Sequence, residues 1–114
     1  MATENIVVVF NNNGMGQAEK ILARKLARAF LGVLDTGNML PRTICLYAEG
    51  VKLAVKGSNV LEDLQVLVDK GVEVIVCTTC LNHFGLMNEL AVGEAKGMKE
   101  IVDAQWAASK VITL

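Results

Sequence analysis

Two cysteines, Cys77 and Cys80, flank Thr78 and Thr79 and follow the largely apolar run 72–76. The β-branched residues of this run predict a buried strand, and the residues from Cys80 onward predict a short helix. In an open α/β sheet, such a turn from strand to helix is a common place for a ligand or a reactive group. Unpaired N–H groups at a helix start favour a thiolate. We therefore expect Cys77 or Cys80 to have a thiol pKa below the usual value of about 8.5.

The Cys-x-x-Cys spacing also fits two other kinds of site, a structural zinc site and a redox-active dithiol. His83 would add a third zinc ligand, but a closed structural zinc site needs four. The remaining thiol, Cys45, lies inside another predicted strand, so we expect no metal. A thioredoxin-like dithiol would follow an early strand and lie beside a proline, whereas this pair comes late and Pro41 is remote in the sequence.

Two further interpretations remain for the same turn. Cys77 could be a small buried residue at the end of a strand. Alternatively, Cys77 is a nucleophile that accepts sulfur as a persulfide, and Cys80 assists or resolves it. Thr78 and Thr79 would then donate hydrogen bonds to the sulfur, and His83 is a candidate proton partner.

Length and charge limit the classes of protein to be considered. The chain has 114 residues, which is enough for one domain over 1–114, and 53% of them are hydrophobic. Its net charge of −1 gives no electrostatic reason to expect binding to nucleic acid or to a membrane. The first residues lack the basic region of a signal peptide, and the three cysteines are an odd number. We expect a cytoplasmic protein with free thiols and no cofactor.

Strand patterns and helix patterns alternate along the chain. The predicted strands are 6–10, 43–47, 72–76, a minor strand at 91–94, and 110–114. Four helices are predicted between the strands. The first follows the turn 11–16, the second covers 59–70, the third is short and irregular over 81–90, and the last begins after Gly97. This alternation predicts a parallel sheet that is covered on both faces.

Apolar spacing also predicts which helix faces are buried. The stripe expected to face the core in the first helix is Ile21, Leu22, Leu26, Ala29, Phe30 and Val33. In the last helix it is Met98, Ile101, Val102 and Trp106. Asn59 and Glu62 fit a capping box at the start of the second helix.

Two other polar patterns gather near the predicted strand ends. Glu49 and Lys52 follow the second strand, so a parallel sheet would bring them to the same rim as Cys77. The turn before the first helix contains Gly14 and Gly16, which alone is a weak phosphate-binding signal. The basic row of Lys20, Arg24 and Arg28 is typical of a solvated helix face.

Short segments spread along nearly the whole chain resemble a known family. They are Met15-Gly16, Gly50-Val51-Lys52-Leu53, Gly57-Ser58, Val60-Leu61-Glu62-Asp63-Leu64, Gly71-Val72-Glu73, Cys77, Thr79-Cys80-Leu81, Val92-Gly93-Glu94 and Val111-Ile112-Thr113-Leu114. Together they are similar to the DsrE/DsrF-like family of sulfur-relay proteins, above all to the C-terminal domain of YedF-type proteins. Those domains usually read Cys-Gly-Thr-Cys, and here Thr78 replaces the glycine.

The resemblance implies a three-layer α/β/α sandwich with a five-stranded parallel sheet. It implies a sulfurtransferase-like protein in which Cys77, with Cys80 second, carries sulfane sulfur or selenium to a partner. We expect Thr78, Thr79, Met15 and Gly16 to contact the substrate. The sulfur-carrier domain that accompanies YedF-type domains is absent here, so a separate small carrier protein would be the donor or acceptor.

An alternative function is a non-catalytic, oligomeric module of the same fold that binds a small ligand through the loops 11–16 and 49–52. In either case we expect a homo-oligomer, because a domain this short buries a modest fraction of its surface while its apolar content is high. We expect the contact surface at Leu86, Met87, Leu90 and Val92, beside the cysteine turn.

Overall fold

The computed structural model describes residues 2–114 and contains one five-stranded sheet. The strands are β1 (Glu4–Phe10), β2 (Pro41–Leu46), β3 (Glu73–Cys77), β4 (Glu94–Lys96) and β5 (Lys110–Thr113). Their order is β4-β3-β2-β1-β5, and every neighbouring pair is parallel. The predicted five-stranded parallel α/β fold is therefore confirmed, whereas the strand order had not been predicted.

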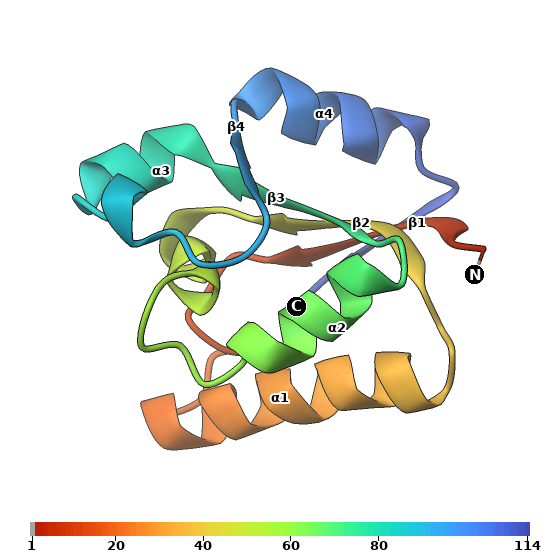
Figure 1. Cartoon of the computed structure of the whole chain (residues 1–114), viewed down its shortest axis with the longest axis horizontal. Coiled ribbons are helices and arrows are strands. Elements are labelled where there is room, and N and C mark those ends of the chain that lie inside the picture. Colours follow the sequence, from red (N-terminus) through yellow and green to blue (C-terminus); the bar gives the residue numbers. More distant parts are fainter. Residues whose placement is uncertain (1) are drawn as a thin grey trace.

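Helices cover both faces of this sheet. The helices are α1 (Lys20–Thr36), α2 (Leu61–Asp69), α3 (Thr78–His83) and α4 (Met98–Ala107), with the 3₁₀ segments η1 (Ala48–Ala54) and η2 (Met87–Glu89). Figure 1 shows α1 and α2 on one face of the sheet and α3 and α4 on the other. Within residues 2–114, no helix is both long and apolar enough to cross a lipid bilayer.

The three inner strands carry the core. Their continuous apolar runs suit strands that are covered by helices on both faces. Val9 of β1 lies opposite Cys45 of β2, which in turn lies opposite Ile75 of β3. All three side chains are buried. Burial raises the pKa of Cys45 to about 11, with a further contribution from the negative charge of Glu73, so this thiol behaves as a core residue.

The predicted buried stripe of α1 was wrong. The residues that face the sheet are Ala23, Ala27, Leu31 and Leu34, with Phe30 half-buried. The larger predicted residues are exposed, including Ile21 at 65% and Val33 at 59%. Small alanine side chains allow the helix to approach the sheet and α2 closely, so its larger apolar residues are left on the outer side.

The last helix shows the same departure from the predicted stripe. Ile101 is buried, but Met98, Val102 and Trp106 are exposed, and Trp106 keeps 89% of its surface. The minor strand lies at Glu94–Lys96, downstream of the predicted 91–94. The α4 helix packs against β1 and β3, and Ile101 is its only buried residue.

The predicted capping box at α2 was also wrong. Val60 is the N-cap residue, and its N–H donates to the Ser58 hydroxyl oxygen at 3.2 Å. The Asn59 side chain bonds to α1 instead. Its Nδ2 donates to the Arg24 carbonyl at 3.2 Å, and its Oδ1 accepts from the Arg24 Nε at 3.4 Å. Asn59 thus lies one residue before the N-cap of α2, and its side chain joins this segment to α1.

Candidate functional site

The cysteine pair occupies the carboxyl end of β3. Cys77 is the last residue of the strand and the N-cap of α3, and it is completely buried. Cys80 lies in the first turn of α3 and is half-buried. Between them, Thr78 is half-buried and Thr79 is exposed. The pair thus combines one enclosed thiol with one that is partly open to solvent.

A backbone group from η1 holds the outer thiol. The Ala48 N–H donates to the Cys80 sulfur at 3.1 Å, although the two residues are 32 positions apart. Ala48 has a positive φ of 53°, a conformation that is uncommon outside glycine. This backbone angle lets the chain turn from β2 into η1 and directs its N–H toward the thiol. Sequence analysis missed the contact because it involves only backbone atoms of Ala48.

The electrostatics at Cys80 differ from our expectation. Burial raises the pKa of the Cys80 thiol above its usual value, the Ala48 N–H lowers it in part, and the adjacent Cys77 sulfur raises it further. The expected lowering of a thiol pKa is therefore not found at Cys80. The physical reason is that burial destabilises the thiolate by more than the single hydrogen bond from the Ala48 N–H stabilises it.

Alkylation of the folded protein should therefore modify Cys80 first, with Cys77 and Cys45 reacting far more slowly because both are completely buried. Since the thiolate is the reactive form, the rate at Cys80 should keep rising with pH beyond the ordinary thiol pKa of about 8.5. Peptide mass spectrometry of iodoacetamide-treated protein over a pH series measures this. Equal labelling of all three thiols, or a rate that levels off below that pH, would contradict it.

The polar rim of the site is built by η1 and α3. Lys52 pairs with Glu49 at 2.7 Å, and its Nζ lies 4.5 Å from the centre of the Phe84 ring, just after α3. The prediction that Glu49 and Lys52 share the rim with Cys77 is confirmed. His83 is exposed and packs edge-on against Phe84, with 5.2 Å between ring centres.

The loop that contains Met15 and Gly16 folds back onto α1. The Met15 N–H donates to the Ala23 carbonyl at 2.9 Å, and the Gly16 carbonyl accepts from the Asn12 side chain at 2.9 Å. Across residues 2–114, no hydrogen bond joins this loop to either cysteine of the turn. Contact of Met15 and Gly16 with a substrate at Cys77 therefore stays a prediction.

No group of three or more His, Cys, Asp or Glu side chains in the described part of the chain is arranged to hold a metal ion. Cys45 lies within β2, in the middle of the sheet, and Cys77 and Cys80 lie at its carboxyl edge. The three thiols are free.

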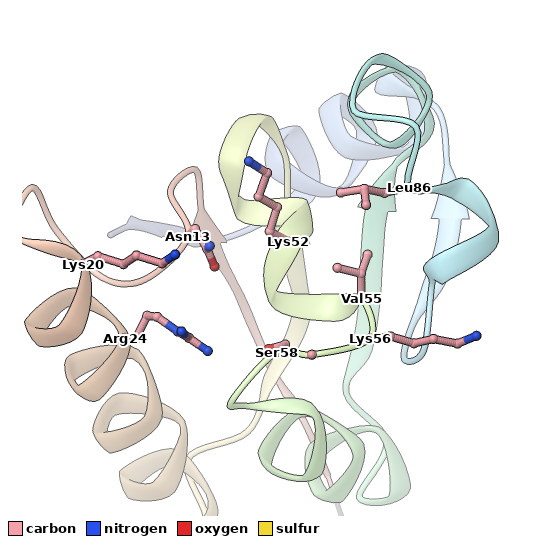
Figure 2. Close-up of a pocket in the computed structure, with 9 residues that line it drawn as sticks. Asn13, Lys20, Arg24, Lys52, Val55, Lys56, Ser58 and Leu86 are labelled. Carbon is pink, nitrogen blue, oxygen red and sulfur yellow. The ribbon is translucent and has the colours of Figure 1, made fainter.

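A polar cavity at this edge of the sheet brings together residues that sequence analysis had treated separately. It has a volume of about 270 Å³ and is lined by side chains from α1, from η1 and from the segment before α2. Lys20 and Arg24 of the predicted solvated row are among them, whereas Arg28 instead pairs with Asp63 of α2 at 3.8 Å. Figure 2 shows the cavity and the side chains around it.

Known families and structures agree with this architecture. The model of the DsrE/DsrF-like family matches residues 4–114. The YchN protein of E. coli is 23% identical, with a TM-score of 0.71 over 99% of this chain and 100% of its own. A protein of unknown function from Methanobacterium thermoautotrophicum, MTH1491, is 18% identical, with a TM-score of 0.67 over 96% of this chain and 97% of its own.

A third similar structure is BT1422 from Bacteroides thetaiotaomicron, a conserved protein of unknown function. It is 14% identical, with a TM-score of 0.65 over 96% of this chain and 95% of its own. No curated protein matches the chain. At these identities the solved structures show the fold alone.

Proposed function

Since the chain belongs to the DsrE/DsrF-like family, we propose that it carries sulfane sulfur as a persulfide on Cys77 and Cys80 for a partner protein. The observation that supports this is the arrangement of the two thiols at the carboxyl end of β3. The half-buried Cys80 is open to a donor, and the completely buried Cys77 lies three residues earlier, at the N-cap of the same helix. A reactive persulfide can thus be received at an open position and kept at an enclosed one.

The chemistry needs no external oxidant or reductant. The Cys80 thiolate attacks the outer sulfur of a donor persulfide, the donor S–S bond breaks, and the donor leaves as a thiol after taking up a proton. The Cys77 thiolate then attacks the outer sulfur of the Cys80 persulfide and restores the Cys80 thiol. Each step exchanges one S–S bond for another, so the electron count is unchanged.

The raised pKa of Cys80 has a further consequence for this scheme. A thiol that stays protonated near neutral pH is a weak nucleophile. The raised pKa therefore slows attack by Cys80 on any sulfur, that of the donor persulfide included, so the uptake of sulfur should become faster as the pH rises. Burial of Cys77 protects a persulfide on this residue from reductants in solution.

The partner in this proposal is a sulfur donor or acceptor protein, such as a small sulfur carrier, and the compartment is the cytoplasm, where thiols stay reduced. Intact mass spectrometry after incubation with a protein or small-molecule persulfide tests the proposal. The mass should rise by one sulfur atom per chain and return to its original value with reductant. A chain that gains no sulfur at any donor concentration would overturn the relay function.

Assembly into homo-oligomers belongs to the same proposal, with a candidate interface that differs from the one expected at Leu86, Met87, Leu90 and Val92. Val92 is buried, and Leu86, Met87 and Leu90 are half-buried against the core of the same chain, so this segment offers little free apolar surface. The large exposed apolar side chains lie mainly on α1 and α4, on opposite faces of the sheet, and include Leu22, Leu26, Val33, Val102 and Trp106.

Light scattering coupled to size exclusion at low micromolar concentration should give a mass above one chain. Leu26→Glu or Trp106→Glu should reduce it to one chain, because a buried charge at an apolar contact has no partner. Lys25→Glu, on a neighbouring exposed position of α1, is the matched control and should leave the mass unchanged. A wild-type mass of one chain at all concentrations would contradict oligomerisation.

A further inference from the structure

The cavity beside the thiol site has an unusual charge. Lys20, Arg24, Lys52 and Lys56 line it together with the polar side chains of Asn13 and Ser58, and no lining residue is acidic. These residues come from four separate parts of the chain, namely the loop after β1, the start of α1, the end of η1 and the segment between η1 and α2. Since the whole chain has a net charge of −1, a cavity lined by four cations and by no acidic residue is a distinct electrostatic feature.

Two of the four cations have carboxylate partners and two do not. Lys52 pairs with Glu49 at 2.7 Å, and Lys56 pairs with Glu89 at 3.6 Å. In Figure 2 the Lys56 side chain points away from the cavity. Within residues 2–114, neither Lys20 nor Arg24 forms an ion pair. Figure 2 shows both side chains extending from α1 toward the cavity. The cavity therefore holds two uncompensated positive charges.

The Arg24 side chain is oriented by one hydrogen bond to Asn59. The Asn59 Oδ1 accepts from its Nε at 3.4 Å, and the Asn59 Nδ2 donates to its carbonyl at 3.2 Å. A guanidinium has five N–H donors in a rigid fork, so one bond to Asn59 leaves the terminal nitrogens free for a ligand. The Ser58 Oγ accepts the Val60 N–H at 3.2 Å, which leaves its own hydroxyl hydrogen to donate.

We propose that this cavity binds a small dianionic oxyanion, namely inorganic phosphate or sulfate. The two unpaired cations match two negative charges, and the Arg24 fork matches two oxygens of a tetrahedral anion. The volume of about 270 Å³ is near the lower end of ligand pockets, which extend from roughly 300 Å³ upward, and this fits a small ligand. No cysteine lines the cavity, so binding here does not depend on the relay.

Calorimetric titration with inorganic phosphate, at constant ionic strength set by chloride, tests the proposal. The wild-type chain should show saturable binding with one site per chain, and sulfate should compete. Arg24→Gln and Lys20→Gln should each weaken binding by about ten-fold or more, since each removes a charged hydrogen-bond donor. Arg24→Lys, which keeps the charge but not the fork, should weaken it as well.

Arg28→Gln is the matched control, because Arg28 lies one helical turn further along α1 and pairs with Asp63 outside the cavity. This variant should bind phosphate like the wild type, and thermal melts should show that all variants are folded. Absence of saturable phosphate binding by the wild type would overturn the proposal. Equal weakening in Arg24→Gln and Arg28→Gln would also overturn it, since only the overall charge would then matter.

Discussion

Replacing Gly50 with alanine should lower the free energy of unfolding by about 3 kcal/mol or more, at the upper end of what overpacking costs. A Cβ at this position would lie 2.1 Å from the Phe10 carbonyl oxygen and 2.8 Å from its carbonyl carbon. These are backbone atoms at the end of β1, where Phe10 pairs with Leu46 and its oxygen accepts the Tyr47 N–H at 3.3 Å. They cannot move aside as a flexible side chain would, so η1 must be displaced.

The matched control for this substitution is Gly32→Ala. A Cβ at Gly32 would meet no heavy atom within 4 Å. Gly32 lies inside α1, where alanine is favoured over glycine by up to about 1 kcal/mol, so this variant should be slightly more stable than the wild type. Urea unfolding followed by circular dichroism measures both values. Similar free energies of unfolding for the two variants would show that the backbone of Phe10 leaves room for a Cβ at position 50.

Gly50→Ala should also change the thiol site. Displacing η1 removes the Ala48 N–H from the Cys80 sulfur, which it otherwise contacts at 3.1 Å. Alkylation of Cys80 in the folded part of the population should therefore change in rate while alkylation in Gly32→Ala does not. This comparison separates a loss of global stability from a change in the site.

Replacing both Cys77 and Cys80 with serine should abolish the reductant-sensitive gain of one sulfur atom. Serine keeps the size of the side chain but cannot form a persulfide, and Cys45 in the core has a thiol pKa of about 11 and no exposed surface. The remaining thiol therefore has neither the thiolate nor the access that the reaction needs. Intact mass spectrometry before and after reductant measures the gain, and Cys45→Ala is the control that should retain it.

The single variants assign the order of transfer. Cys80→Ser should slow uptake of sulfur by about ten-fold or more, because the accessible thiol that reacts with the donor is lost. Cys77→Ser should still take up sulfur, but the adduct on the half-buried Cys80 should be reduced faster than in the wild type. Normal uptake by Cys80→Ser would make Cys77 the entry point. A sulfur adduct in the double variant would exclude this pair as the carrier.

The sequence by itself determined the elements and the edge at which they meet. Apolar runs of strand length, separated by segments with helical spacing, predicted the parallel sheet. A strand that is buried on both faces is apolar throughout, whereas a helix with one buried face has apolar residues at every third or fourth position. Cys77, Glu49 and Lys52 were placed at one rim because the carboxyl ends of parallel strands share one edge of the sheet. These inferences depend on chain direction and local pattern, and the structure agrees with them.

The tertiary structure decided which helix faces are buried and which groups meet at the site. Apolar spacing predicted that Leu26 and Val33 of α1 would face the core, but close packing selected Ala23 and Ala27, whose small side chains allow short approach distances. The contact of Ala48 with Cys80 and the bond of Asn59 with Arg24 join residues more than 30 positions apart. Such contacts follow from the order of strands and the rotation of each helix, and neither is encoded in local spacing.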